Sequence, residues 1–296
     1  MHFVDAKGIL TSNNGLHGMN IYRGCTHGCI YCDSRSTCYQ MKHLFEDVEV
    51  KQNAPKLLED ALRRKRRKCM IGTGAMSDPY MHCEEELCLT RQCLGIILKY
   101  GFGLAIQTKS DRILRDIDLL DEINKSTKCV VQMTLTTYDD RLCSIIEPNV
   151  CNTKRRLEVL RQMKERGIPT VVWLTPILPF INDTEENIMS ILEACLDTGV
   201  KGIICFDMGL TLRDGDREYY YEALDRHFLG LKQRYIKTYG NSYNLPSPDN
   251  DKLMKLFRDF CRDHGIMCSP DECFRYLGEF PEKYSQISIF DDVDVE

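Results

Sequence analysis

The chain has 296 residues, of which 43% are hydrophobic and 28% charged, and its formal net charge is −5. This composition is that of a globular protein with a large core, and the charge supplies no global basic field for binding nucleic acid. The N-terminus lacks a secretory signal and no apolar run is long enough to span a bilayer, so we expect a cytoplasmic protein without membrane contact. The sixteen cysteines are therefore expected to be reduced thiols, most of them buried as small hydrophobes.

Apolar, β-rich segments alternate with amphipathic segments along the first two thirds of the chain. The expected strands are 18–24, 68–74, 103–109, 129–137, 170–178 and 200–208. The expected helices are 54–66, 85–101, 111–124, 152–167 and 183–199, several of which end on glycine or begin at Asp or Asn. This alternation predicts parallel strands joined by right-handed helical crossovers.

The number of these units predicts an incomplete barrel. A full eight-unit barrel needs about 250 residues, whereas the six units here occupy roughly 200. We therefore predict an α/β fold with a partial (β/α)6 TIM-type barrel over residues 1–208. Residues 209–296 are predicted to form a helical C-terminal extension and polar tail packed on the barrel, with helices at 216–239, 249–264 and 271–279. Ligands of parallel α/β sheets bind at the carboxyl ends of the strands.

Three cysteines follow the first expected strand in "YRGCTHGCIYCDSRS". Cys25, Cys29 and Cys32 can ligate three irons of a [4Fe–4S] cluster and leave the fourth iron open. Two glycines, at positions 24 and 28, let the loop curl and turn backbone N–H groups toward a negatively charged cluster. The alternative is a structural zinc site, whose fourth ligand would have to be Cys38, His27 or a distant residue.

The spacing Cys25-x3-Cys29-x2-Cys32, with Tyr31 before the last cysteine, resembles the cluster motif of the radical S-adenosylmethionine (SAM) enzymes. This resemblance implies a partial (β/α)6 barrel, a [4Fe–4S] cluster and SAM bound to the open iron. It also implies reductive cleavage of SAM to a 5′-deoxyadenosyl radical that abstracts hydrogen from a substrate. Electrons would come from a reductant such as flavodoxin or ferredoxin.

Further segments, at 71–80, 106–120, 133–137 and 175–187, resemble the spore photoproduct lyase-like branch, often described as DNA repair photolyases. In that lyase a serine beside an aspartate after strand two and a lysine after strand three contact SAM, which implies this role for Ser77 and Lys109. Thr134 and Thr136 are expected on one face of strand four, toward the cosubstrate, and Tyr31 beside the cluster. The alternatives are a surface lysine at a helix entry and ordinary β-forming threonines.

One position departs from that branch. The lyase has a hydrogen-donor cysteine two residues before the serine, and this chain has Ala75 there. We therefore expect a different substrate or a different route for the product radical. Cys261, Cys268 and Cys273 have spacings that match no auxiliary-cluster pattern we trust.

Two features bear on nucleic-acid partners. The tail sequence "QISIF" resembles the peptide that docks bacterial DNA repair proteins on the sliding clamp, with Gln286, Ile289 and Phe290 as its anchors. A strand packed on the domain is the alternative for this peptide. Candidates for phosphate contacts are five arginines expected at the top of the barrel, whose orientation the sequence does not reveal: Arg35, Arg112, Arg141, Arg155 and Arg213.

The sequence thus predicts a radical SAM enzyme whose substrate it does not specify, with a nucleic-acid lesion as the first candidate. Two other functions stay open. One is radical modification of a peptide or small metabolite, and the other is a non-catalytic metal-binding or clamp-associated adaptor.

Overall fold

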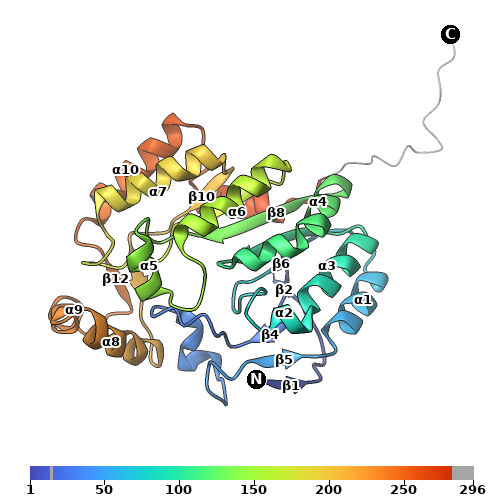
Figure 1. The fold of residues 1–296 in the computed structure, drawn as a ribbon, viewed down its shortest axis with the longest axis horizontal. Coiled ribbons are helices and arrows are strands. Elements are labelled where there is room, and N and C mark those ends of the chain that lie inside the picture. The colour runs from blue at the N-terminus through green and yellow to red at the C-terminus, as the bar shows by residue number, and fades with distance from the viewer. Residues whose placement is uncertain (14–15, 282–296) are drawn as a thin grey trace, which may run out of the picture.

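The computed structural model describes residues 1–13 and 16–281, and its centre is an open seven-stranded sheet (Figure 1). Six strands are parallel, and the seventh, β2, pairs antiparallel with β3 at one edge. The sheet order is β10 (Gly202–Ile204), β9 (Thr170–Trp173), β8 (Cys129–Thr134), β7 (Gly103–Thr108), β6 (Met70–Thr73), β3 (Leu16–Met19) and β2 (Leu10–Asn13). The predicted partial barrel is confirmed, because the two end strands do not pair with each other within the described residues.

Helices cover one face of this sheet in an arc (Figure 1). They are α1 (Ala54–Arg64), α3 (Leu89–Lys99), α4 (Ile117–Ser126), α6 (Thr153–Glu165) and α7 (Glu185–Thr198), with the shorter η3 (Asp111–Asp116), α2 (Glu84–Leu87) and α5 (Asp140–Ile146). Helix α1 shows why these segments pack, since Ala54, Leu58 and Leu62 recur every four residues and are all buried. Gly199 ends α7 in the left-handed conformation that glycine adopts without strain.

The predicted strand 18–24 is wrong in its extent. Its first part belongs to β3 of the main sheet, whereas β4 (Tyr22–Arg23) pairs antiparallel with β5 (Glu49–Lys51) in a second, three-stranded sheet. The third strand of that sheet is β1 (His2–Val4), which runs parallel to β5. A local apolar pattern does not reveal which sheet a strand joins, because pairing partners lie far away in the chain.

The predicted helix 216–239 is also divided. Helix α8 (Asp216–His227) ends before α9 (Leu231–Tyr239), and Gly230 between them has a φ of +77°. The two helices bury Tyr220 and Tyr235, whose hydroxyl groups lie 2.9 Å apart, against Ile30 and Tyr31 of the cysteine loop. The first part of the extension therefore supports the loop that carries the cysteines.

The rest of the extension closes the sheet on both faces. A short ribbon of β11 (Gly209–Thr211) and β12 (Asn244–Pro246) leads to α10 (Asn250–Asp263), which packs against α7. Helix α11 (Pro270–Gly278) packs on the face opposite the outer helices, where Cys273 and Leu277 contact the side chains of the strands. The division into domains at residue 208 stays a prediction.

Two other predictions concern the ends of the molecule and its surroundings. The tail residues Gln286, Ile289 and Phe290 lie outside the described residues, so clamp docking stays a prediction. In the described part of the chain, no helix combines the length and the apolar character that crossing a membrane requires.

Candidate functional site

The cysteine loop lies between β4 and the short helix η1 (Asp33–Arg35). Cys25 and Cys29 are buried and Cys32 is partly buried. Gly24 has a φ of +88°, and a Cβ on it would lie 2.4 Å from the carbonyl oxygen of Phe45, so no other residue fits there. The N–H of Cys25 donates to that same carbonyl at 3.0 Å, which fixes where the loop begins.

The ends of three neighbouring strands bring other predicted residues to this loop. A cavity of about 90 Å³ is lined by all three cysteines together with Ser77 after β6, Lys109 after β7 and Thr134 at the end of β8. Tyr31 and Thr136 do not line it. The structure therefore places six of the eight predicted site residues around one cavity at the carboxyl edge of the sheet.

Ser77 offers an unused hydrogen-bonding group in this cavity. Its side chain is buried, and its Oγ has no hydrogen-bond partner among the described residues. Buried hydroxyl groups normally find a partner, so an orphaned one that lines a cavity indicates a position where a ligand completes the hydrogen bond.

Asp78, which is not among the predicted site residues, organises the same edge. Its carboxylate accepts hydrogen bonds from the N–H of Tyr80 at 2.8 Å, the hydroxyl of Thr108 at 2.7 Å and the N–H of Lys109 at 2.8 Å. It thereby joins the loop after β6 to the loop after β7. The signal that could have found it is its position directly after Ser77 at a strand end.

A buried ion pair lies beneath the cysteine loop. Glu147 and Arg156 are both 0% exposed, and Nη2 of Arg156 lies 2.6 Å from the Glu147 carboxylate. The hydroxyl of Tyr31 donates to the other oxygen of Glu147, and Nη1 of Arg156 donates to the carbonyl of Thr134 at 3.1 Å. Tyr31 thus anchors the loop to the barrel by its hydroxyl group, rather than lining the cavity.

These neighbours set the ionisation of Glu147. Burial alone would raise its pKa, but the positive charges of Arg156 and Lys109 and the hydrogen bond from Tyr31 outweigh burial and hold the pKa below its ordinary value. Nζ of Lys109 lies 5.9 Å from the centre of the Tyr31 ring. Lys109 is partly buried, so it is not the exposed surface lysine of the alternative interpretation.

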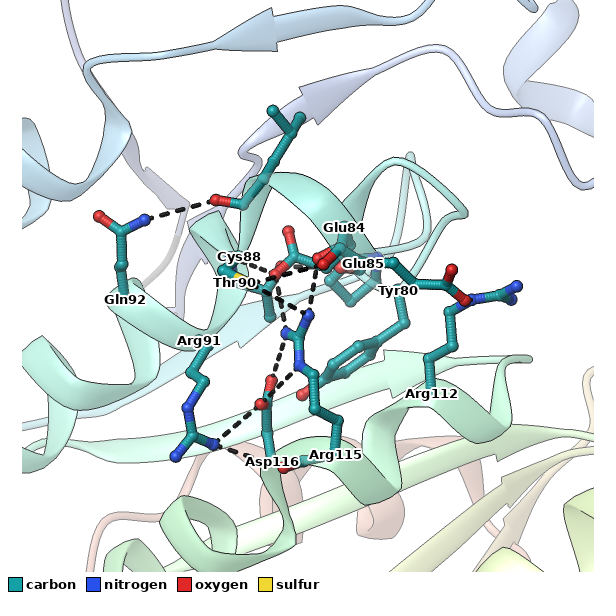
Figure 2. A network of polar contacts seen from close by, with 12 residues as sticks. Tyr80, Glu84, Glu85, Cys88, Thr90, Arg91, Gln92, Arg112, Arg115 and Asp116 are labelled. Atoms are coloured by element: carbon teal, nitrogen blue, oxygen red, sulfur yellow. Dashed lines mark hydrogen bonds and ion pairs between the residues drawn. The ribbon is translucent and has the colours of Figure 1, made fainter.

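A second polar network supports the loop that carries Ser77 and Asp78 (Figure 2). Arg115 lies between the carboxylates of Glu84 and Asp116, at 2.8 and 2.7 Å, and both carboxylates are fully buried. Glu84 also accepts the N–H of Thr90 at 3.0 Å, and the Thr90 hydroxyl donates to the carbonyl of Pro79 at 2.7 Å. The network therefore ties the end of this loop to the segment after β7.

The two threonines predicted on one face of a strand have different surroundings. Thr134 is the last residue of β8 and lines the cavity. Thr136 lies beyond the strand, so the alternation of side chains that the prediction used does not extend to it. Its carbonyl accepts hydrogen bonds from the side chains of Asn182 at 2.7 Å and Asn187 at 3.1 Å, which fixes the loop after β9.

The distances between the Sγ atoms of the loop cysteines indicate which kind of metal centre these residues can bind. Among the described residues, only His2, His43 and Glu49 form a trio of His, Cys, Asp or Glu whose ligand atoms all lie within 4.8 Å of one another. At least two of the three Sγ atoms of the loop cysteines are thus more than 4.8 Å apart, whereas two thiolates on a tetrahedral zinc ion are separated by roughly 3.8 Å. Wider spacing fits ligands on separate irons of a cluster, so the donor set agrees with an iron–sulfur centre.

The C-terminal cysteines have a different character. Cys261 and Cys273 are buried. Each packs in a hydrophobic cluster of the core, and Cys268 packs against one of those clusters. These contacts are those of small apolar side chains.

Replacement of Arg156 by methionine tests the buried ion pair. We expect Arg156→Met to lower the free energy of unfolding by about 3–5 kcal/mol, because the carboxylate of Glu147 loses its buried partner. Arg161→Met, on the same helix but half exposed, is the matched control and should change stability by less than about 0.5 kcal/mol. Anaerobic urea unfolding measures both, and equal stability of the two variants would contradict the role given to the pair.

Comparison with known proteins agrees with this arrangement. The family profile of the Radical SAM superfamily matches residues 19–195. Two relatives described only as uncharacterised proteins come from Mycobacterium tuberculosis, 29% identical over 79% of this chain and 70% of the relative, and from Methanocaldococcus jannaschii, 34% identical over 56% and 62%. A structure of spore photoproduct lyase complexed with dinucleoside spore photoproduct aligns with a TM-score of 0.62 at 13% identity, over 90% of this chain and 80% of the lyase, which shows a shared fold. The chain therefore belongs to the radical SAM superfamily, whose enzymes use a [4Fe–4S] cluster and SAM, and it has the fold of spore photoproduct lyase.

Proposed function

We propose that Cys25, Cys29 and Cys32 hold the cluster, that Ser77, Lys109 and Thr134 bind SAM, and that the substrate is a nucleic-acid lesion. The observation that carries the first two assignments is the single cavity that these six side chains line. When bound, the cluster and SAM supply a 5′-deoxyadenosyl radical that abstracts hydrogen from the substrate. Radical SAM enzymes need a reductant, and we propose flavodoxin or ferredoxin for this one.

The residues of the chain have separate tasks in this proposal. The ammonium group of Lys109 donates to the carboxylate of SAM, and the free hydroxyl of Ser77 donates to its polar end. Asp78 holds the backbone of Lys109, so the lysine starts from a fixed position. The buried thiols and the helices packed over the loop keep water away from the site.

Iron content and nucleoside formation test the enzyme. After anaerobic reconstitution with iron and sulfide, we expect the wild type to release 5′-deoxyadenosine from SAM on reduction. Cys29→Ala should lose both the cluster and this product, whereas Cys268→Ala should keep both. Iron analysis and chromatography of the nucleoside measure the two outcomes. Zinc that is lost in Cys29→Ala, together with no nucleoside from the wild type, would instead support the non-catalytic adaptor.

Equilibrium binding of SAM tests the two binding residues. Lys109→Met should weaken binding by about 10- to 100-fold, because a hydrogen bond to a charged group contributes about 1.5–3 kcal/mol. Ser77→Ala should weaken it by about 2- to 10-fold, since a neutral hydrogen bond contributes about 0.5–1.5 kcal/mol. Lys154→Met, an exposed lysine at the start of α6, is the control and should bind like the wild type. Iron content equal to that of the wild type shows that each variant has kept its cluster, and unchanged SAM affinity in Lys109→Met would refute its assignment.

A larger opening beside the cavity is the proposed substrate site. It measures about 650 Å³, within the range of ligand pockets, and includes Thr26 of the cysteine loop, His82, Arg112 and Cys151. Cys151 connects the two sites, because its thiol donates to the carbonyl of Lys109 at 3.1 Å. Support for a lesion comes from the lyase of the same fold, whose structure contains a dinucleoside spore photoproduct.

The charges of this chain limit the number of phosphate contacts. Four of the five arginines predicted to contact phosphate are in ion pairs: Arg35 with Glu46, Arg112 with Glu85, Arg155 with Asp111 and Arg213 with Asp33. We therefore propose that the enzyme recognises a lesion and few flanking nucleotides, not a long duplex.

A panel of lesion-containing oligonucleotides, read by mass spectrometry, tests the substrate. We expect an altered product from at least one lesion, detected after nuclease digestion by the mass and retention of the released nucleosides, because reversal of a thymine dimer does not change the mass of the intact strand. We also expect an affinity that falls only weakly with salt, with a logarithmic slope no steeper than about −2 for roughly two phosphate contacts. The undamaged oligonucleotide of the same sequence is the control. SAM cleavage without any altered oligonucleotide would favour modification of a peptide or small metabolite.

A further inference from the structure

A cluster of histidine and carboxylate side chains lies on the small sheet, apart from the cysteine loop. His2 lies on β1, and Glu49 is the first residue of β5. The two residues are partners in the pairing of these parallel strands. His43 comes from the segment between η2 (Thr37–Tyr39) and β5. One ligand atom of each residue lies within 4.8 Å of the others, and all three side chains are partly buried.

One ring nitrogen of His43 lies near Glu49 but forms no hydrogen bond with any described residue. Its Nε2 lies 3.8 Å from a carboxylate oxygen of Glu49, which is too far for a hydrogen bond. The same nitrogen is buried and has no hydrogen-bond partner among the described residues. Two ligands of one tetrahedral metal ion, each about 2.0–2.1 Å from it, are separated by roughly 3.4 Å, so the observed spacing is close to that of a metal site.

The Nδ1 atoms of both histidines have partners of the kind that metal-binding histidines usually have. Nδ1 of His2 lies 3.0 Å from the carboxylate of Asp47, and Nδ1 of His43 lies 3.0 Å from the carbonyl oxygen of Leu44. A carbonyl oxygen only accepts hydrogen bonds, so Nδ1 of His43 carries the proton and Nε2 carries a lone pair in the neutral ring. An ionised Asp47 has the same effect on His2. Carboxylate and carbonyl partners of this kind orient histidines that bind metal.

We propose that His2, His43 and Glu49 bind a zinc ion, with water as the fourth ligand. Two imidazole nitrogens and one carboxylate oxygen form a donor set that suits zinc, whereas calcium and magnesium prefer oxygen ligands alone. The site contains no thiolate, so it is chemically distinct from the cysteine loop.

A zinc ion there joins three pieces of the chain that meet at the start of the cysteine loop. The segment of His43 also contains Phe45, whose carbonyl accepts the N–H of Cys25 at 3.0 Å. On the other side, β5 pairs with β4, which leads directly into Gly24 and Cys25. The ion therefore fixes the base of the loop without contacting the cavity, and the inference does not depend on the proposed substrate.

Metal analysis of the tag-free holoenzyme, with its cluster reconstituted, tests this site. After dialysis against zinc and removal of free metal, we expect about one zinc ion per chain in the wild type. His43→Gln and Glu49→Gln should retain at least about tenfold less zinc while keeping the iron content of the wild type. His227→Gln, an exposed histidine on α8, is the control and should retain zinc in full.

X-ray absorption at the zinc edge of the wild type tests the ligands without any variant. We expect a nitrogen and oxygen shell at about 2.0–2.1 Å with imidazole scattering, and no sulfur at about 2.3 Å. Absence of zinc, a sulfur shell, or full zinc retention in both variants would overturn the proposal. Because each of these results is independent of SAM cleavage, failure of the zinc site and failure of the proposed enzyme are distinguishable.

Discussion

The carboxylate of Glu147 and the guanidinium of Arg156 meet inside the protein, where neither is exposed to solvent. Two buried charges are tolerated only when each satisfies the other and the remaining hydrogen-bonding groups find partners. The hydroxyl of Tyr31 donates a hydrogen bond to one oxygen of Glu147, and the guanidinium of Arg156 donates to the carbonyl groups of Thr134 and Cys151. The pair therefore joins the cysteine loop, the end of β8 and helix α6 into one unit, and the geometry of the candidate site depends on it.

Around this pair, close backbone contacts of glycines and side-chain hydrogen bonds hold the loops that form the site. Gly24 and Gly74 approach neighbouring carbonyl groups so closely that a Cβ would overlap them, at 2.4 Å from Phe45 and 1.9 Å from Gln107. Asp78 and the Arg115 network then connect the loops after β6 and β7 (Figure 2). Because loops carry all of these functional groups except Thr134, these contacts position them as regular hydrogen bonding does elsewhere in the sheet.

The distribution of cysteines reflects two different uses of the same side chain. Cys129 and Cys195 are fully buried in the apolar core, where their thiols pack as small hydrophobes. The thiols of Cys25, Cys29 and Cys32 line a cavity beside polar groups. The helices α8 and α9 pack against the loop of these three cysteines, so the C-terminal extension contributes to the site although none of its residues up to 281 lines the cavity.

The sequence by itself determined the class of the fold and the family of the enzyme. The alternation of apolar and amphipathic segments and the spacing of Cys25, Cys29 and Cys32 are local properties. Both can therefore be recognised from the sequence alone. Only the tertiary structure decided that Glu147 and Arg156 support Tyr31, that Asp78 joins two loops, and that His2 meets Glu49. Tyr31 and Glu147 are 116 residues apart in the chain, and no local pattern encodes such a pairing. It arises because the fold brings the ends of separate strands to one edge, where buried polar groups must find partners.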